Sequence, residues 1–506
     1  MTFESDLTDL RARLQDLSDL GGVGALLGWD QSTYQPPAAG AGRARQQALL
    51  ARLTHAQATS PELGRLLERL EAGQGHLDPD GVEARTIKVA RRDFERATRL
   101  PEAFVAEFSQ HSGETYDAWT RARPANDFAG LAPRLEKSLD LTRQYAGYHP
   151  EFAHPMDFFV DASDEGLTGA RVREVFTQLR GALVPLVAQV TAAPAPRTDF
   201  LHRPYPMAQQ LAFGEAVARD YGYDFARGRQ DLTHHPFMTR LGHDDVRITT
   251  RVKERDLTEA LFSTLHETGH ALYEQGTAPE LAGTPLDSGT SAGVHESQSR
   301  LWENIVGRSL PFWQHYFPRL QAAFPEQLGD VRLDEFYRSV NEVRRSLIRT
   351  DADELTYNLH VITRFELELD LLEGRLAVPD LADAWHAAYE RNLGLRAPDH
   401  RDGVLQDVHW YGGSLAGNFQ GYTIGNVLSA QFFDAACRAH PEIPEATARG
   451  EFSALLGWLQ QNVYRFGRSR TPDELVRQAT GQPMTVEPYL AYLRAKYGAL
   501  YGITPV

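Results

Sequence analysis

Apolar residues recur at alternating three- and four-residue spacing through most of this 506-residue chain. Leu7, Leu10, Leu14 and Leu17 form the first such series, which is the pattern of a helix packed along another helix. The same amphipathic pattern marks the segments 43–57, 64–71, 82–98, 102–122 and 128–147. It resumes after residue 290 and continues toward the C-terminus. The chain is therefore predicted to fold as a mainly α-helical protein.

Two stretches interrupt this helical pattern in the first half of the chain. The glycine-rich stretch that starts at Gly21, followed by Pro36 and Pro37, is predicted to end the first helix. The segment 191–206, TAAPAPRTDFLHRPYP, is predicted to be a loop by its composition. The sequence has the same character on both sides of this loop, so the loop is not predicted to be a domain boundary. The chain carries no internal repeat.

A short region before residue 253 has the alternation of a β-strand instead. Val246, Ile248 and Val252 sit at even spacing with polar residues between them, and Gly242 belongs to a turn that precedes them. This pattern predicts a β-hairpin within 236–252. The hairpin leads directly into the next helical segment.

Charge and cysteine content exclude several classes of protein. The net charge of −16 argues against a binder of nucleic acid or anionic membranes, because those need a cationic face. No apolar run reaches the roughly 20 residues that a membrane span needs. The acidic N-terminal residues lack the basic and apolar regions of a signal peptide, and the single Cys437 cannot form an internal disulfide. We therefore expect a cytoplasmic protein.

The segment LFSTLHETGHALYEQG contains two histidines four positions apart with a glutamate between them. Residues four apart stack on one face of a helix, so His266 and His270 point the same way and can share one tetrahedral Zn²⁺. Glu267 is rotated off that face by one residue, which suits a general base that takes a proton from water at the metal. An ordinary helix with two surface histidines is the alternative. The apolar flanking residues argue against it, because they bury the helix and buried histidines need partners.

The ends of this helix are also marked in the sequence. Asp256 and Glu259 have the D-x-x-E spacing of a capping box. In such a box the Asp256 side chain accepts from the backbone N–H of Glu259, and the Glu259 side chain accepts from the backbone N–H of Asp256. Gly276 is a natural C-terminal stop. We therefore predict a helix of about five turns that carries both histidines.

A zinc site needs a third ligand from the protein. The extended motif H-E-x-x-H-x-x-G-x-x-H does not continue here, because Tyr273 stands where that motif has its glycine. A glutamate from a later helix is the other common solution, and a helix predicted over 289–309 offers Glu296 and Glu303. Spacing alone does not choose between them. Small neighbouring residues favour Glu296, and Glu303 suits a supporting ion pair.

With these motifs the chain resembles a known family, the zinc metallocarboxypeptidases of the thermostable carboxypeptidase Taq type. Short motifs typical of that family all occur here, in the same order. They are D-x-R-x-T at Asp245–Thr249, H-E-x-x-H at His266–His270, H-E-S-[GQ] at His295–Gln298, I-R-x-x-A-D at Ile348–Asp353 and G-x-x-Q-D-x-H-W at Gly403–Trp410. Trp29–Thr33 also resembles the W-D-x-x-T stretch of the family, so the likeness extends from about residue 29 to 426.

The resemblance implies an almost entirely helical body with a deep central groove, similar to thimet oligopeptidase and the angiotensin-converting enzymes. A small β-sheet is expected beside the active site. We expect a single catalytic domain over 1–506, with an N-terminal helical part of about 1–190 and the motifs within 236–426. The resemblance makes Glu296 the third metal ligand and implies a homodimer. The ligand set suits Co²⁺ as well as Zn²⁺.

A carboxypeptidase must recognise a free C-terminal carboxylate, which a guanidinium group does with two parallel charged hydrogen bonds. Arg349 and Arg247 are the arginines that the motifs offer. For Arg349 the alternative is a helix ion pair with an acidic neighbour such as Asp351, although residues two apart on a helix do not face each other. For Arg247, predicted to lie on a strand beside Asp245, the alternative is a structural ion pair.

His409 and Tyr422 lie thirteen positions apart (422 − 409). Related helical zinc peptidases place a histidine and a tyrosine at similar spacing to stabilise the oxyanion, so the resemblance implies that role here. The alternative for both is a core hydrogen bond within their glycine-rich segment. Gln406 and Asp407 are candidate substrate-binding residues. They are expected to form hydrogen bonds with backbone groups or to orient His409.

These patterns lead to one functional hypothesis. The chain is predicted to be a metal-dependent carboxypeptidase of broad specificity that acts on peptides with a free C-terminus. Glu267 takes a proton from the attacking water and returns it to the leaving amine. One alternative is a zinc oligopeptidase that cuts internal bonds. The other is a non-catalytic helical scaffold with a metal kept for stability, and Glu267 argues against it because a structural site needs no general base.

Overall fold

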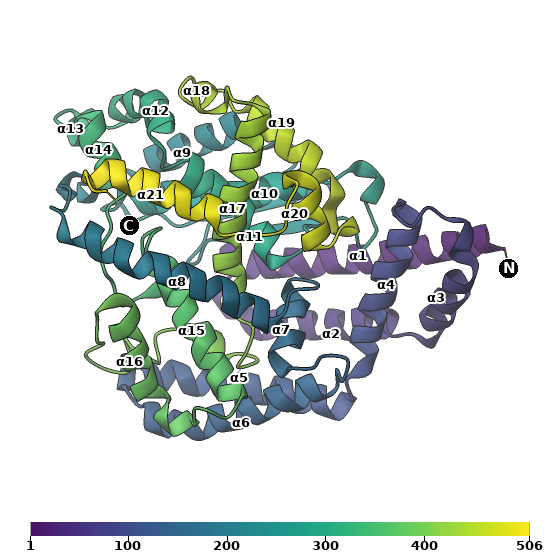
Figure 1. The fold of residues 1–506 in the computed structure, drawn as a ribbon. Coiled ribbons are helices and arrows are strands. Elements are labelled where there is room, and N and C mark those ends of the chain that lie inside the picture. The colour runs from purple at the N-terminus through teal and green to yellow at the C-terminus, as the bar shows by residue number, and fades with distance from the viewer. Residues whose placement is uncertain (1, 505–506) are drawn as a thin grey trace. The chain divides into compact units, whose positions relative to one another are not determined.

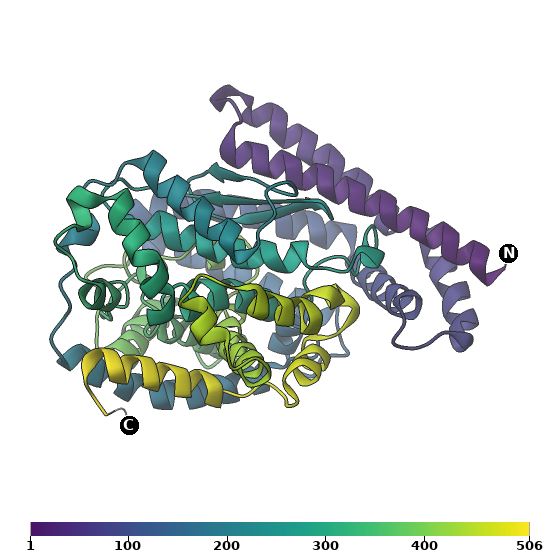
Figure 2. The same ribbon diagram turned by 90° about the horizontal axis from the view of Figure 1, so that it is seen from above.

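The computed structural model describes residues 2–504 and is mainly helical (Figure 1). It has one small sheet, whose strands are seen as arrows in Figure 2. The described chain forms two compact units, each built from segments that lie far apart in the sequence. The first unit comprises the chain up to Arg99, Arg197–Val340 and Phe432–Pro483, and the second comprises Leu100–Pro196, Asn341–Gln431 and the chain from Met484. The predicted fold class, mainly α with a small sheet, is confirmed.

The first unit holds the sheet and the helix with the two histidines. Its helices are α1 (Phe3–Thr33), α2 (Gly40–Ala58), α3 (Pro61–Gly73), α4 (Val82–Arg99), α9 (Met207–Tyr221), α10 (Leu257–Gln275), α11 (Ala292–Arg300), α12 (Leu310–Ala323), α13 (Pro325–Leu328), α14 (Leu333–Ser339), α18 (Ile443–Thr447), α19 (Ser453–Asn462) and α20 (Pro472–Thr480). Its strands are β1 (Gln230–Leu232), β2 (Met238–Gly242) and β3 (Asp245–Thr250).

The described residues of the second unit form helices and connecting loops, and no strand. Its helices are α5 (Glu102–Ala125), α6 (Phe128–Gly147), α7 (Pro155–Ser163), α8 (Gly169–Ala192), α15 (Tyr357–Leu372), α16 (Leu381–Leu393) and α21 (Glu487–Tyr501). The long helix α17 (Gln420–Ala439) begins in this unit and ends in the first. None of the helices within residues 2–504 combines the length and the apolar composition that a membrane span requires.

Helix α1 is longer than the sequence predicted, because it continues through the glycine-rich stretch that starts at Gly21. The predicted break there is wrong. At Gly22 a Cβ atom would clash with the carbonyl oxygen of Leu241 in β2, so the glycine lets the helix lie directly against the sheet. The helix ends at Thr33, before the Pro36-Pro37 pair, and α2 then runs back beside it (Figure 2).

The leucine series of α1 faces the core as its spacing predicts, with Leu10 and Leu14 buried and Leu7 and Leu17 partly buried. Leu10 and Leu14 pack with Leu66 and Leu67 of α3 and with Ile87 of α4 in one apolar cluster. Each of these side chains is at least nine-tenths removed from solvent. Their burial holds the N-terminal helices together in the first unit.

The sheet has the strand order β1-β3-β2. Strands β2 and β3 form the antiparallel hairpin that the alternation of Val246 and Ile248 predicted, and both of these side chains are fully buried. Strand β1 pairs with β3 in parallel, with Asp231 opposite Thr249, and the sequence did not predict it. Its residues, Gln230–Leu232, are too few to carry a period-two pattern.

The histidine helix α10 begins and ends where the sequence predicted, but its N-terminal cap differs. The side chain of Asp256 accepts from the backbone N–H of Thr258, not from that of Glu259. Glu259 pairs instead with Arg251 and Lys253, so the predicted capping box is wrong. The competing cations draw the Glu259 carboxylate away from the helix N-terminus.

The predicted helix over 289–309 is divided in the structure. An α-helical part, α11, carries Glu296 and is capped by Ser291, whose hydroxyl accepts from Val294 N–H. A π-helical turn over Leu301–Val306 follows and carries Glu303. The wider turn changes which side chains face α10, and π-helical turns are often found at functional sites.

Candidate metal centre

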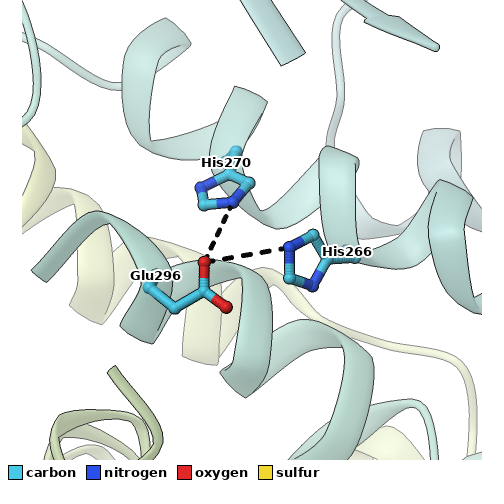
Figure 3. A group of neighbouring side chains, drawn as sticks. All are labelled: His266, His270 and Glu296. Atoms are coloured by element: carbon cyan, nitrogen blue, oxygen red, sulfur yellow. Dashed lines mark ion pairs between the residues drawn. The ribbon is translucent and has the colours of Figure 1, made fainter. Parts of the chain in front are cut away.

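Three side chains of the first unit converge as a metal site requires (Figure 3). His266 and His270 project from the same side of α10, and Glu296 reaches toward them from α11. The Oε2 atom of Glu296 lies 3.9 Å from Nε2 of His266 and 3.6 Å from Nε2 of His270. One donor atom from each residue lies within 4.8 Å of the other two. Two imidazoles and a carboxylate at these separations fit a divalent ion with an open fourth position.

A glycine explains how α10 and α11 come close enough for this convergence. Gly269 lies between the two histidines, and a Cβ atom there would be 2.5 Å from the carbonyl oxygen of Gln298 and 2.6 Å from Cα of Ser299. Both of these are backbone atoms of α11. Only glycine therefore permits this packing, which places Glu296 opposite the histidines.

The charge states of His270 and Glu296 suit metal binding. Burial lowers the pKa of His270 to about 4, so its ring is neutral at pH 7, the form that binds a metal. Arg300 donates to Oε1 of Glu296 at 2.7 Å, which leaves Oε2 to face the histidines. Burial disfavours the charge on Glu296, but Arg300 and the two histidines outweigh it and lower the pKa of that carboxyl.

Glu267 occupies the next position on α10 after His266 and is 6% exposed. Burial raises the pKa of the Glu267 carboxyl to about 7, although the charge of His266 opposes the shift. The backbone of Met238 in β2 forms a hydrogen bond with it. A carboxyl with a pKa near 7 can both accept and release a proton at neutral pH, which is what a general base and acid requires.

Glu303, the other glutamate that spacing offered, supports His266. Its Oε2 atom lies 2.9 Å from Nδ1 of His266 and therefore accepts from that ring. Burial disfavours the charge on Glu303, but the hydrogen bond from His266 and the charge of Arg300 lower its pKa to about 2. A carboxylate in this place fixes the ring with Nε2 toward Glu296.

Most of the other candidate residues gather in a cluster within the second unit. The carboxylate of Asp407 accepts from Nε of Arg349 at 2.6 Å and from Nδ1 of His409 at 2.5 Å. The hydroxyl of Tyr422 lies 3.4 Å from Nε2 of His409. Burial disfavours the charge on Asp407, but its donors outweigh this and lower its pKa well below the usual range. Asp407 thus orients His409 and binds Arg349.

Gln406 and a buried arginine complete this cluster. The Gln406 side chain accepts from the backbone N–H of Arg349 at 3.1 Å and donates to the carbonyl of Leu347 at 3.0 Å. Arg364 donates to both Gln406 and Asp407. Arg349 is therefore held by ion pairing with Asp407, and not by the helix ion pair with Asp351 that was its alternative.

Arg247 lies in the first unit, on β3 as predicted. Its Nε and Nη2 atoms donate to both oxygens of Asp245, at 2.8 and 2.7 Å, so the structural ion pair considered from the sequence is present. The guanidinium carbon lies 4.3 Å from the ring centre of Trp29 in α1. Stacking and ion pairing together hold the Arg247 side chain in one orientation.

Comparison with known proteins decides the family. A model of the carboxypeptidase Taq (M32) metallopeptidases matches residues 9–497. The chain belongs to this family. As an M32 metallopeptidase it depends on a divalent metal and hydrolyses peptides.

The similar proteins match this M32 chain over its whole length. Thermostable carboxypeptidase 1 of Thermus thermophilus is 41% identical, over 99% of this chain and 100% of that protein. Carboxypeptidase 1 of Bacillus subtilis is 36% identical, over 99% of each chain. The crystal structure of an M32 carboxypeptidase from Deinococcus radiodurans R1 has a TM-score of 0.97 and 63% identity, over 99% of this chain and 100% of that one. This M32 protein is therefore a metal-dependent carboxypeptidase. The oligopeptidase and scaffold alternatives receive no support.

Sequence reasoning missed three buried partners of the candidate residues in this M32 chain. Glu274 lies four residues after His270, so the two side chains share one face of the helix. This spacing could have indicated Glu274 as a neighbour of the histidine motif. Arg364 is the lone cation in the apolar middle of α15, which was a second signal. The stacking of Trp29 on Arg247 joins residues more than 200 positions apart, and no local pattern predicts it.

Proposed function

We propose that His266, His270 and Glu296 bind a single Zn²⁺ ion and that Glu267 is the general base for hydrolysis of the C-terminal peptide bond. The observation that carries this proposal is the convergence of one donor atom from each of the three residues within 4.8 Å. The nearly buried Glu267 carboxyl follows His266 on the same helix. The same ligands suit Co²⁺, so we expect that Co²⁺ can bind at this site in place of Zn²⁺.

A bound ion supplies a Lewis acid that acidifies water and polarises the peptide carbonyl. Glu267 accepts the proton of the attacking water, because its pKa of about 7 matches the working pH. It then returns that proton to the leaving amine. Glu303 and Arg300 keep His266 and Glu296 oriented throughout, through the hydrogen bonds described above.

The substrates we propose are peptides of broad sequence with a free C-terminal carboxylate. Arg349 and Arg247 are the proposed cations for that carboxylate, and Gln406 and Asp407 act by holding Arg349 in place. Each arginine is already bound to an aspartate, so each is oriented before substrate arrives. We assign His409 the role of oxyanion donor, and Asp407 fixes its tautomer by accepting from Nδ1.

Tyr422 is the second proposed oxyanion donor. Its hydroxyl lies near Nε2 of His409, so both groups can donate to one developing negative charge. The two roles rest on the family resemblance together with this proximity.

The test of the proposed function is Glu267→Gln. Glutamine keeps the size of the side chain but cannot accept a proton, so kcat should fall by about 10²–10⁴-fold. Zinc content should stay at one ion per chain, because Glu267 is not a ligand. The control is Glu280→Gln, which makes the same chemical change at an exposed position and should keep full activity.

Release of C-terminal residues from peptides, followed by mass spectrometry, measures the activity, and elemental analysis measures the metal. Near-normal activity of Glu267→Gln would exclude Glu267 as the base. Loss of zinc in that variant would show that the ligand set is assigned wrongly.

The predicted homodimer has a candidate surface on the paired helices α1 and α2. Val23 and Leu26 of α1 and Leu49 and Leu53 of α2 are each 40–50% exposed. Large apolar side chains that gather on neighbouring helices mark an interaction surface. We propose that a second copy of the chain covers them. The cytoplasmic location stays a prediction from the sequence.

A further inference from the structure

The candidate ligand His270 has a partner on the ring nitrogen that faces away from Glu296. Nδ1 of His270 lies 2.6 Å from Nδ1 of His295, the residue before Glu296. Nε2 of His295 lies 2.8 Å from Oε1 of Glu274, one turn further along α10. Three side chains thus form a continuous hydrogen-bonded series.

The direction of these hydrogen bonds follows from the chemistry of the rings. An imidazole that binds a cation through Nε2 carries its proton on Nδ1, so His270 donates to His295. His295 then accepts at Nδ1 and carries its own proton on Nε2, which donates to Glu274. The reverse direction would set a lone pair of His295 against a carboxylate. Only one arrangement of protons satisfies all three side chains.

Glu274 is anchored at the far end of the series. It is 3% exposed, and its Oε1 atom also accepts from the backbone N–H of Gly289 at 2.9 Å. Its Oε2 atom lies 3.4 Å from Nε of Arg240 in β2. Arg240 is paired in turn with the buried Asp287. The carboxylate therefore cannot move without breaking an ion pair.

The backbone around the series is shaped to admit the ring of His295. At Gly289 a Cβ atom would lie 2.5 Å from Cδ2 of His295 and 2.8 Å from Cε1 of Tyr273. A larger residue there would displace the imidazole. The glycine therefore makes room for the ring between Glu274 and His270.

We propose that His295 and Glu274 are positioning residues for His270: the series fixes the tautomer and the ring orientation with which His270 binds the metal. His266 has a direct carboxylate partner in Glu303, whereas His270 reaches its carboxylate through a second imidazole. This inference rests on the proposed metal site, and its test separates the two.

The test measures the dissociation constant of Zn²⁺ by competition with a chelator. Glu274→Leu and His295→Leu each remove a hydrogen-bonding partner, so each should weaken zinc binding by about 10–100-fold, the usual effect of losing a partner behind a metal-binding histidine. His295→Gln keeps an acceptor and a donor on one planar amide, so it should restore most of the affinity lost in His295→Leu. Glu280→Leu, the same change as Glu274→Leu at an exposed position, should bind zinc like the wild type.

Thermal melting of the metal-free protein separates positioning from general stability. The proposal is overturned if Glu274→Leu and His295→Leu lower that melting temperature but leave zinc affinity unchanged. It is equally overturned if His295→Gln is as weak as His295→Leu. Should either Glu274→Leu or His295→Leu fail to fold, the other decides alone. His270→Ala is the separate check on the metal site: unchanged zinc binding in that variant would refute the site itself.

Discussion

At the scale of single residues, the buried carboxyl groups of this chain differ in pKa because they have different partners. Glu296 and Glu303 face cations and keep their charge, whereas Glu267 is raised to a pKa of about 7 by burial. Glu368 of α15 belongs to the second kind. It accepts from Trp410 and from the backbone N–H of Gly417, and it thereby holds the loop between His409 and Tyr422.

Burial raises the pKa of Glu368 to about 7, even though its hydrogen bonds from Trp410 and Asn418 favour the charge. The folded protein therefore holds a proton that the unfolded chain releases above its ordinary value of 4.5. The stabilising contribution of Glu368 is full below that value and is lost as pH rises toward 7. We predict that the free energy of unfolding of the wild type falls by about 3 kcal/mol between these two pH values. Glu368→Gln should not show this loss, because glutamine does not titrate.

Melting temperatures at pH 5 and pH 8 measure this difference. The gap between the wild type and Glu368→Gln should move in favour of the variant at pH 8. Glu390→Gln, an exposed change on α16, should follow the wild type. A gap that stays constant between the two pH values would contradict the raised pKa.

At the scale of elements, apolar spacing predicted the positions of α2 to α6, and the histidine helix was predicted to its last residue. The helices α7, α8 and α9 had no predicted bounds. What the sequence could not give was contact between distant segments. The glycine-rich stretch of α1 was interpreted as a break, because Leu241, which packs against Gly22, lies in a strand more than 200 residues later. Spacing alone did not choose between Glu296 and Glu303, and the family resemblance favoured Glu296. In the structure Glu296 faces both histidines, whereas Glu303 accepts from Nδ1 of His266.

Gly269 sets that packing, so its substitution tests the element scale. Gly269→Ala should force α10 and α11 apart, because its Cβ atom would meet the backbone of Gln298 at 2.5 Å. We expect a loss of about 1–3 kcal/mol of stability, typical of overpacking, and weaker zinc binding as Glu296 moves away from the histidines. Melting temperature and zinc titration measure the two effects.

Gly181→Ala is the matched control for this change. Gly181 lies inside α8, and a Cβ atom there would meet nothing within 4 Å. Alanine should stabilise that helix by about 0.5–1 kcal/mol and leave zinc binding unchanged. If Gly269→Ala behaved like Gly181→Ala, the close approach of α10 and α11 would not control the metal site.

At the scale of the whole molecule, the M32 family and the class of fold were recognisable from short motifs, and the homodimer remains to be tested. The chain has a mass of 56.6 kDa, and we predict twice that mass in solution. Leu49→Glu combined with Leu53→Glu should give the monomer, because burying two carboxylates opposes association. Sedimentation velocity measures the change.

Val105→Glu is the control, because Val105 is an exposed apolar residue of α5 and is not one of the four side chains of the proposed surface. That variant should keep the mass of the wild type. A wild-type protein that sediments as a monomer would contradict the homodimer. A double variant that stays dimeric would show that the contact lies elsewhere on the chain.

The central claim is that two histidines of α10 and a glutamate of α11 hold one divalent ion. Anomalous diffraction at the zinc edge, from crystals of the zinc-loaded protein, tests it most directly. We predict one strong peak at about 2.0–2.2 Å from Nε2 of His266, Nε2 of His270 and the Glu296 carboxylate. An active, zinc-containing crystal with no peak between these three side chains would contradict the claim.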